Sequence, residues 1–347
     1  MRYLFSILFM LCASFSFAQT ITDVDFSVDG NNIVVTYNLS DCKSCDIGLF
    51  VSIDGGLTFC NNSLVHTTGD IGADVTSGNK RITWNPLILY PNGLEGNVMF
   101  EVRYMGNVRG KKGNMSFTAK GVSFEMVYVE GGTFSMGATK EQGGEVQDAE
   151  RPVHEVTLSD YYIGKTEVTQ ELWQAVMGNN PSYHKGSNNP VDNESWNDVQ
   201  EFISKLNSIT GQTFKLPTEA QWEYAARGGN KSRGYKYSGS NNINNVAWYR
   251  DNSDNSDIKT HTVATKQPNE LGIYDMSGNV WEWCSDWYGD YDSFSQTDPR
   301  GAYSGSRRVD RGGCDWYGVK YCRVSNRDGY APGSRDSLIG FRLALAQ

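Results

Sequence analysis

Short alternating runs of apolar and polar residues dominate the first third of the chain. Residues 33–37 (IVVTY), 47–51 (IGLFV) and 98–102 (VMFEV) are rich in β-branched and aromatic residues. Turn-forming clusters such as Asp29-Gly30-Asn31 separate these runs. The pattern predicts an all-β sandwich over residues 19–104.

Helix signals appear only in the later part of the chain, among irregular stretches. Three segments begin with a hydroxyl N-cap residue, and two of them carry an amide or carboxylate three residues later that completes a capping box. The second of these segments also has an apolar stripe on one face. The predicted N-caps are Thr169, Ser195 (with Asp198) and Thr218 (with Gln221), the stripe is Val199, Phe202, Ile203 and Leu206, and glycine stops stand at Gly178 and Gly228.

A polar stretch that contains glycine, from Gly106 to Gly121, is typical of a linker between the two parts. We therefore predict an α+β protein with a β-sandwich over residues 19–104, a linker over residues 105–121 and a second domain over residues 122–347. The sandwich resembles the immunoglobulin-like or fibronectin-like modules that precede many exported enzymes.

The first residues have the layout of a cleavable secretory signal peptide, predicted over residues 1–18. Arg2 is followed by an apolar run from Tyr3 to Cys12, and Ser16-Phe17-Ala18 precede Gln19. The run is too short for a transmembrane span, and no later segment approaches the roughly 20 apolar residues that a span requires. We expect a secreted, periplasmic or cell-surface protein.

The net charge bears on the kind of partner, and the cysteine content bears on the expected disulfides. The formal net charge of −9 disfavours nucleic acid as a partner. In an oxidising compartment disulfides are the default for the cysteines beyond the signal peptide, which are Cys42, Cys45, Cys60, Cys284, Cys314 and Cys322. The first three can form one bridge and leave one thiol, with the connectivity open. A structural bridge is favoured over a redox or zinc motif at Cys42 and Cys45, because no helix-opening context or second ligand pair accompanies them.

Several separated motifs occur in one order between Phe124 and Arg342. They are Met126–Gly137, Arg151–Val156, Lys165–Thr169, Leu216–Glu223, Gly272–Trp283, Arg311–Gly313 and Gly340–Arg342. Together they resemble the formylglycine-generating enzyme, or sulfatase-modifying factor, family. The resemblance implies that residues 122–347 form a domain related to C-type lectins, with little regular secondary structure and a groove on one face.

A calcium site is predicted at the segment from Asp275 to Glu282. Two carboxylates flank a Gly-Asn turn that can direct backbone carbonyls inward, which gives the oxygen ligands that calcium prefers. The alternative is a capped turn in which Glu282 bonds to backbone amides. The resemblance implies Asp275 and Glu282 as side-chain ligands, Gly278 and Val280 as carbonyl ligands, and a second calcium site near residues 245–252 without assigned ligands.

The chemistry implied by the resemblance is oxygen-dependent oxidation of a substrate cysteine to formylglycine, with copper(I) held between two thiolates five residues apart. Counted from Gly312-Gly313, the two thiolates would fall at Tyr317 and Cys322, and Cys314 takes the place of a pocket serine. Copper(I) prefers sulfur, which a tyrosine cannot supply. Three interpretations of Cys322 remain: a disulfide with Cys284, which is favoured; an irregular copper site with Cys314; or a lone redox thiol.

The aromatic residues of the last third suit a pocket for a peptide or sugar. We expect Trp281 and Tyr317 to line it together with Cys314 and Cys322. Two functions follow: an oxidase with an incomplete copper site, or a polypeptide- or glycan-binding component of a cell-surface, gliding or secretion assembly. Tyr317 favours the second. The scattered histidines and the lack of hydrolase or nucleotide motifs give other enzyme classes no support.

Overall fold

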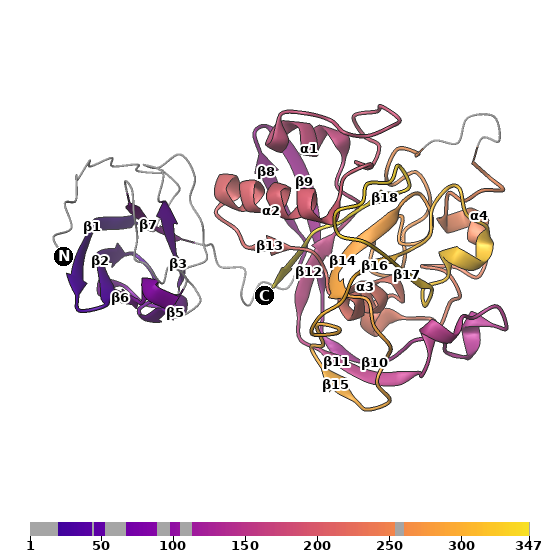
Figure 1. Cartoon of the computed structure of the whole chain (residues 1–347), viewed down its shortest axis with the longest axis horizontal. Coiled ribbons are helices and arrows are strands. Elements are labelled where there is room, and N and C mark those ends of the chain that lie inside the picture. The colour runs from indigo at the N-terminus through magenta and orange to yellow at the C-terminus, as the bar shows by residue number, and fades with distance from the viewer. Residues whose placement is uncertain are drawn as a thin grey trace. The chain divides into compact units, whose positions relative to one another are not determined.

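The computed structural model describes residues 20–43, 45–52, 67–88, 98–104, 113–253 and 260–346. The chain divides into two compact units, Met1–Lys111 and Lys112–Gln347, each of which has its own core (Figure 1). The predicted signal peptide and Cys60 lie outside the described residues.

The first unit consists of two antiparallel sheets that contribute to one hydrophobic cluster. Val35 and Trp84 enter this cluster from one sheet and Ile47 and Leu49 from the other, so the predicted alternation directs these side chains inward. The first sheet has the order β1 (Thr20–Asp29), β2 (Asn32–Ser40), β6 (Gly78–Trp84) and β4 (Thr67–Gly69), and the second has the order β5 (Gly72–Val75), β3 (Cys45–Ser52) and β7 (Met99–Tyr104).

A disulfide joins Cys42, just after β2, to Cys45 at the start of β3, with a Cα–Cα distance of 6.0 Å. This is the structural bridge that the sequence favours for this pair. It ties the two sheets together where the chain passes from one to the other.

The described residues of the second unit form three sheets and four α-helices, as expected for an α+β domain (Figure 1). The longest sheet has the order β13 (Phe214–Lys215), β19 (Ala344–Ala346), β12 (Tyr161–Gly164), β9 (Val122–Val129) and β8 (Met115–Ala119). A three-stranded sheet has the order β10 (Gly132–Met136), β11 (His154–Leu158) and β15 (Gln296–Thr297). A four-stranded sheet has the order β17 (Arg327–Tyr330), β16 (Arg308–Arg311), β14 (Trp281–Trp287) and β18 (Ile339–Gly340).

Strand β8 corrects the predicted linker. Residues 115–119 were expected to connect the domains, but they pair in antiparallel register with β9. Met115, Phe117 and Ala119 alternate with polar residues, and the Phe117 ring stacks at 5.8 Å from that of Phe124. The alternation lies in a polar stretch that contains glycine, so the sequence did not reveal it as a strand. The second domain therefore includes β8 and begins before residue 122.

The three predicted helices are confirmed, together with their caps. In α1 (Gln170–Met177), α2 (Trp196–Thr210) and α3 (Glu219–Ala226) the hydroxyl oxygens of Thr169, Ser195 and Thr218 accept the predicted backbone bonds, and the second and third helices have complete capping boxes. A single further turn forms α4 (Ile243–Val246). Helix α3 packs against β10, β11, β14 and β16. Among the described residues, no helix is long and apolar enough to cross a bilayer.

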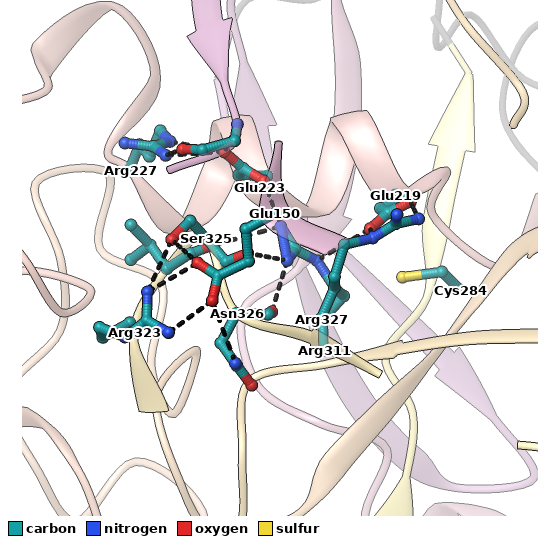
Figure 2. A network of polar contacts seen from close by, with 12 residues as sticks. Glu150, Glu219, Glu223, Arg227, Cys284, Arg311, Arg323, Ser325, Asn326 and Arg327 are labelled. Carbon is teal, nitrogen blue, oxygen red and sulfur yellow. Dashed lines mark hydrogen bonds and ion pairs between the residues drawn. The ribbon is translucent and has the colours of Figure 1, made fainter. Parts of the chain in front are cut away.

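Buried ion pairs, rather than apolar residues alone, connect α3 to the strands around it (Figure 2). Arg327 bonds both oxygens of Glu219 at 2.7 Å, and Arg311 pairs with Glu223. Arg323 bonds the two oxygens of Glu150 at 2.6 and 2.5 Å, and Ser325 also donates to this carboxylate. These bonds anchor the chain from residue 311 to residue 327.

Replacing Arg323 tests how much this anchor contributes. Arg323→Met leaves Glu150 buried without its cation, so we expect the free energy of unfolding in urea to fall by about 3–5 kcal/mol. The control, Arg335→Met, removes an exposed pair with Asp198 and is expected to cost less than about 1 kcal/mol. Equal losses in the two variants would contradict this account.

Candidate functional site

The four-stranded sheet that contains β14 separates two environments. Residues directly opposite one another in antiparallel strands share a face. The register therefore places Glu282, Arg311 and Arg327 together on the face with the ion pairs. On the opposite face it places Trp283, Asp310 and Asp328 together.

The structure brings the two predicted pocket residues together. The ring of Trp281 meets that of Tyr317 edge-on at 6.2 Å, and Tyr321 lies 4.9 Å from Tyr317 and 6.5 Å from Trp281. Trp281 is buried, whereas Tyr317 is 37% exposed. We call Trp281, Tyr317, Tyr321 and the exposed Tyr330 the aromatic face.

Two thiols lie behind the aromatic face. Cys314 and Cys322 are both fully buried, and the sulfur of Cys322 lies against Gly313, where a Cβ would approach it to 3.0 Å. Burial, and then the charge of Asp315, raises the pKa of Cys322 to about 12, and the same two causes raise the pKa of Cys314 well above its usual value. Burial therefore disfavours the thiolate form of both cysteines.

The favoured disulfide between Cys284 and Cys322 is not formed. Among the cysteines that the structure describes, Cys284, Cys314 and Cys322 carry free thiols. Cys284 lies on the ion-pair side of β14, in the same cluster as Trp222 and near Arg311 (Figure 2). Cys322 belongs to a separate cluster with Tyr237 and Tyr249. The two cysteines therefore belong to different clusters. The expected compartment and the number of cysteines, on which the predicted disulfide was based, do not reveal this separation.

The donor set does not fit the copper site of the resemblance. The phenol of Tyr317 stands where one of the two thiolates is required, and copper(I) prefers sulfur, which a phenol does not supply. In the described part of the chain, no group of three or more His, Cys, Asp and Glu side chains is arranged to hold a metal ion. No catalytic step through copper follows from this geometry.

The segment predicted to bind calcium forms a tight left-handed turn. Asp275, Gly278 and Asn279 have φ angles of 59°, 82° and 64°. Glycine is required at position 278 because a Cβ there would lie 2.1 Å from the carbonyl oxygen of Trp248. Asp275 Oδ2 accepts a bond of 2.7 Å from Ala264 N.

Glu282 has a different role from both predicted alternatives. Its carboxylate accepts two bonds of 2.6 Å from Arg342 and one of 2.7 Å from Trp222 Nε1, and none of these donors is a backbone amide. Arg342 lies far along the chain, so the sequence carried no local signal of this pair. The carboxylate of Glu282 therefore contributes to the buried ion-pair network.

Glu167 is a buried carboxylate at this turn that sequence reasoning missed. Its Oε1 accepts from Asn279 Nδ2 at 3.0 Å. Burial, and then the neighbouring charge of Asp275, raises the pKa of Glu167 well above its usual value. Glu167 also hydrogen-bonds the side chain of Asp275, and two carboxyl groups this close fit a hard cation held partly by carbonyls. In the sequence, Glu167 stood out only as part of the motif Lys165–Thr169, which indicated the family and not a metal ligand.

Near the second predicted calcium site, the side chain of Asn252 is engaged locally. Its Nδ2 donates to Ala247 O at 2.9 Å, and its Oδ1 accepts from Tyr249 N at 2.9 Å. These bonds close the turn after α4.

Sequence reasoning also missed a polar cavity of about 190 Å³. Its walls include Glu219, Arg327 and Asp286. Burial, and then the charge of Glu219, raises the pKa of Asp286 to about 7. The cavity borders the ion pairs and includes none of the predicted site residues.

The fold and the buried ion network define an α+β domain of the class found in sulfatase-modifying factors. Residues 112–347 match the profile of the sulfatase-modifying factor enzyme 1-like domain. The chain belongs to this family.

The chain is similar to several proteins with different names. A formylglycine-generating enzyme of Streptomyces coelicolor is 29% identical over 284 residues, which cover 63% of this chain and 88% of that protein. Chaperone protein LppX of Paenibacillus barcinonensis is 38% identical over 214 residues, which cover 48% of this chain and 73% of that protein. The structure of Treponema denticola variable protein 1 superposes with a TM-score of 0.60 at 37% identity and covers 68% of this chain and 100% of that one.

Thiol labelling tests the arrangement of cysteines. Because burial shields Cys284, Cys314 and Cys322, we expect iodoacetamide to leave all three unmodified in the native protein and to modify all three after denaturation without reductant. Peptide mapping by mass spectrometry gives the readout. If Cys284 and Cys322 become reactive only after reduction, they form a disulfide and the assignment of free thiols is wrong.

Proposed function

We propose that the second domain binds a polypeptide at the aromatic face, as a component of a cell-surface or secretion assembly, and does not oxidise cysteine. The observation that carries this proposal is the donor set behind that face: a phenol, Tyr317, stands where the resemblance requires the first of the two thiolates, and Cys314 and Cys322 are fully buried with pKa values raised by burial.

The burial of the thiols bears directly on the oxidase alternative. A thiolate is required both to ligate copper(I) and to react with sulfur, and its formation is favoured by a nearby cation or a helix N-terminus. Here the charged group that acts on both Cys314 and Cys322 is the carboxylate of Asp315, which disfavours a thiolate. The site therefore lacks the electrostatic support for the family chemistry.

Binding is favoured by the rings that remain accessible. Tyr317, which contacts the buried Trp281, and Tyr330 are 37% and 41% exposed, and such rings bind extended chains at low entropic cost. Relatives in the family include a protein named as a chaperone as well as formylglycine-generating enzymes. A polypeptide is thus preferred to a glycan as the partner, and a glycan is the alternative.

An aldehyde assay separates the two functions. The protein is incubated with copper(I), oxygen and a Cys-x-Pro-x-Arg peptide, and the product is examined by mass spectrometry and aldehyde-reactive labelling. We expect no conversion to formylglycine, whereas the Streptomyces coelicolor relative serves as the positive control under the same conditions. Stoichiometric aldehyde formation that depends on Cys322 would overturn the non-catalytic proposal.

Export and the first unit complete the proposal. Residues 1–18 act as a secretory signal, and the two-sheet unit is an immunoglobulin-like or fibronectin-like module that presents the second domain outside the cytoplasm. The disulfide between Cys42 and Cys45 supports this location, because such bonds persist in oxidising compartments.

We also propose that a structural calcium ion binds at the left-handed turn. Asp275 and the carbonyls of Gly278 and Val280 would hold it, with Glu167 as a neighbouring carboxylate, and the ion would compensate buried negative charge. The two adjacent buried carboxyl groups of Asp275 and Glu167 support this assignment, whereas Glu282 is committed to Arg342.

Calcium binding is expected to raise the melting temperature by several degrees, because an ion that binds only the folded state stabilises it. Asp275→Asn should reduce this shift, whereas Asp148→Asn, at an exposed position elsewhere, should preserve it. The readout is differential scanning fluorimetry with added calcium or chelator. An unchanged melting temperature, together with native mass spectra that show no bound calcium, would contradict the assignment.

A further inference from the structure

The polar cavity of the second domain has no part in the proposed function. Its volume of about 190 Å³ is below the roughly 300 Å³ typical of pockets for drug-sized ligands, so it suits a compact ligand. Strands β11, β14 and β17, the start of α3 and the segment from residue 289 to residue 302 contribute to its walls. Three aspartates line it: Asp286, which is buried, and Asp290 and Asp292, which are exposed. The cavity therefore connects a buried carboxylate with exposed ones.

The carboxylate of Asp286 has one engaged oxygen and one that is not. Its Oδ2 accepts bonds from Glu219 N at 3.1 Å and from Ser285 Oγ at 2.7 Å. Its Oδ1 accepts no hydrogen bond from the residues that the structure describes. Gly301 packs against this oxygen, because a Cβ at that position would lie 2.9 Å from it. The side chain is only 3% exposed, so its second oxygen takes a donor from whatever occupies the cavity.

The strongest donors of the cavity wall are already engaged. Arg327 donates to both oxygens of Glu219 at 2.7 Å and to the carbonyls of Gly289 and Ala149 at 2.7 and 3.2 Å. Tyr291 Oη donates to the same glutamate at 3.0 Å. The pair of Arg327 and Glu219 is neutral as a unit, so the aspartates give the cavity a net negative charge.

His154 on β11 adds a second acceptor to the wall. Its Nδ1 lies 3.1 Å from Pro152 O and donates to it, because a carbonyl oxygen only accepts. In the neutral ring Nε2 is then an acceptor, and it makes no hydrogen bond within the described ranges. Acceptors therefore line the cavity from both β11 and β14.

The chemistry of the wall favours a primary ammonium over other cations. The Cζ of Arg327 lies 4.0 Å from the centre of the Tyr291 ring, and that of Arg308 lies 3.5 Å from the centre of the Trp287 ring. Because these rings already contact cations, a flat guanidinium or a quaternary ammonium gains little from stacking on them. An ammonium instead has three N–H donors for separate acceptors. Among the described residues, no group of three or more His, Cys, Asp and Glu side chains is arranged to hold a metal ion.

We propose that this cavity binds a small primary ammonium group, with Asp286 and His154 as buried acceptors and Asp290 and Asp292 as exposed ones. The cavity shares no lining residue with the aromatic face, so the proposal does not rest on the proposed function. A free amine and a lysine side chain both carry this group, and titrations with the two distinguish these sources.

Calorimetric titration of the full chain with three small probes tests the proposal. 2-Aminoethanol has a charge and N–H donors, choline keeps the charge without N–H donors, and ethylene glycol lacks the charge. We expect 2-aminoethanol to bind at least about tenfold more tightly than each of the other two, because neither of them can make a charge-assisted N–H bond to a carboxylate.

Two variants connect the binding to the cavity. Asp286→Asn removes the charge and keeps an oxygen for the bonds from Glu219 N and Ser285 Oγ, so the affinity should fall at least about tenfold. Ala302→Phe retains every carboxylate and fills the space, so it should abolish binding. The control, Asp251→Asn, lies at an exposed position that does not line the cavity and should leave the affinity unchanged.

Folding of the variants is checked by their melting temperatures. Asp290→Asn, at an exposed position of the cavity wall, leaves the interior intact and should weaken binding by about threefold, as expected for the loss of an exposed charge. Unchanged affinity in Asp290→Asn, Asp286→Asn and Ala302→Phe would place the amine elsewhere and contradict the proposal.

The affinity should also depend on pH through Asp286. Burial, and then the charge of Glu219, raises the pKa of Asp286 to about 7. An ammonium binds the ionised carboxylate, so the affinity should rise as the pH increases from about 6 to about 8, and Asp286→Asn should remove most of this rise. The other charged or titratable groups that act on Asp286, respond to its charge or share the cavity are His154 on β11, Lys215 on β13, Glu219 on α3, Cys284 on β14, Asp290, Asp292, Arg308 on β16 and Arg327 on β17.

Three further results would overturn the proposal. Equal affinity for 2-aminoethanol and ethylene glycol would show that no cation is recognised. Equal affinity for 2-aminoethanol and choline would show that N–H donors are not needed. Calcium or magnesium that binds more tightly than 2-aminoethanol, and no longer binds to Asp286→Asn, would identify a metal site.

A lysine probe, Nα-acetyl-lysine N-methylamide, distinguishes the sources of the ammonium. Tighter binding than that of 2-aminoethanol supports a lysine side chain of a polypeptide, and weaker binding supports a free amine. Both results support an ammonium site. The aldehyde assay concerns different residues, so its outcome leaves this proposal unchanged.

Discussion

The second domain depends on glutamate–arginine pairs placed where other domains place apolar side chains. Glu150 with Arg323, Glu219 with Arg327, Glu223 with Arg311 and Glu282 with Arg342 connect segments that are distant in sequence. The guanidinium groups also bond backbone carbonyls, including those of Gly164 and Tyr274 from Arg342. The domain has short strands and long irregular segments, so many backbone carbonyls do not pair within a β-sheet. The arginine guanidinium groups donate hydrogen bonds to some of these carbonyls.

The same network determines what the opposite face of the sheet can do. Because Arg311 and Arg327 point to one side of β16 and β17, the adjacent pair Asp310 and Asp328 points to the other. On that other side Asp310 is buried, and burial, followed by the charge of Asp328, raises its pKa well above the usual value. One sheet thus keeps the glutamate–arginine pairs on one face and this buried aspartate on the other, and a change in strand register would mix the two.

Sequence reasoning succeeded where the signal was local. Capping residues such as Ser195 and Asp198 act within one turn, and the helix that they predict is present. It failed where partners come from afar: the direction of Cys284 depends on which face of β14 it occupies, and the commitment of Glu282 depends on Arg342. Asp286 gave no signal at all, because the cavity that it lines is formed by segments that lie far apart in the sequence.

The position of β19 has a consequence for how the domain is made. Residues 344–346 lie between β12 and β13, in the sheet that residues 115–129 begin. The sheet therefore lacks an interior strand until the last residues are available, and its closure joins contacts of very high sequence separation, which slows folding. Until β19 is in place, this incomplete sheet presents two unpaired edges, at β12 and β13, where association between chains is favoured.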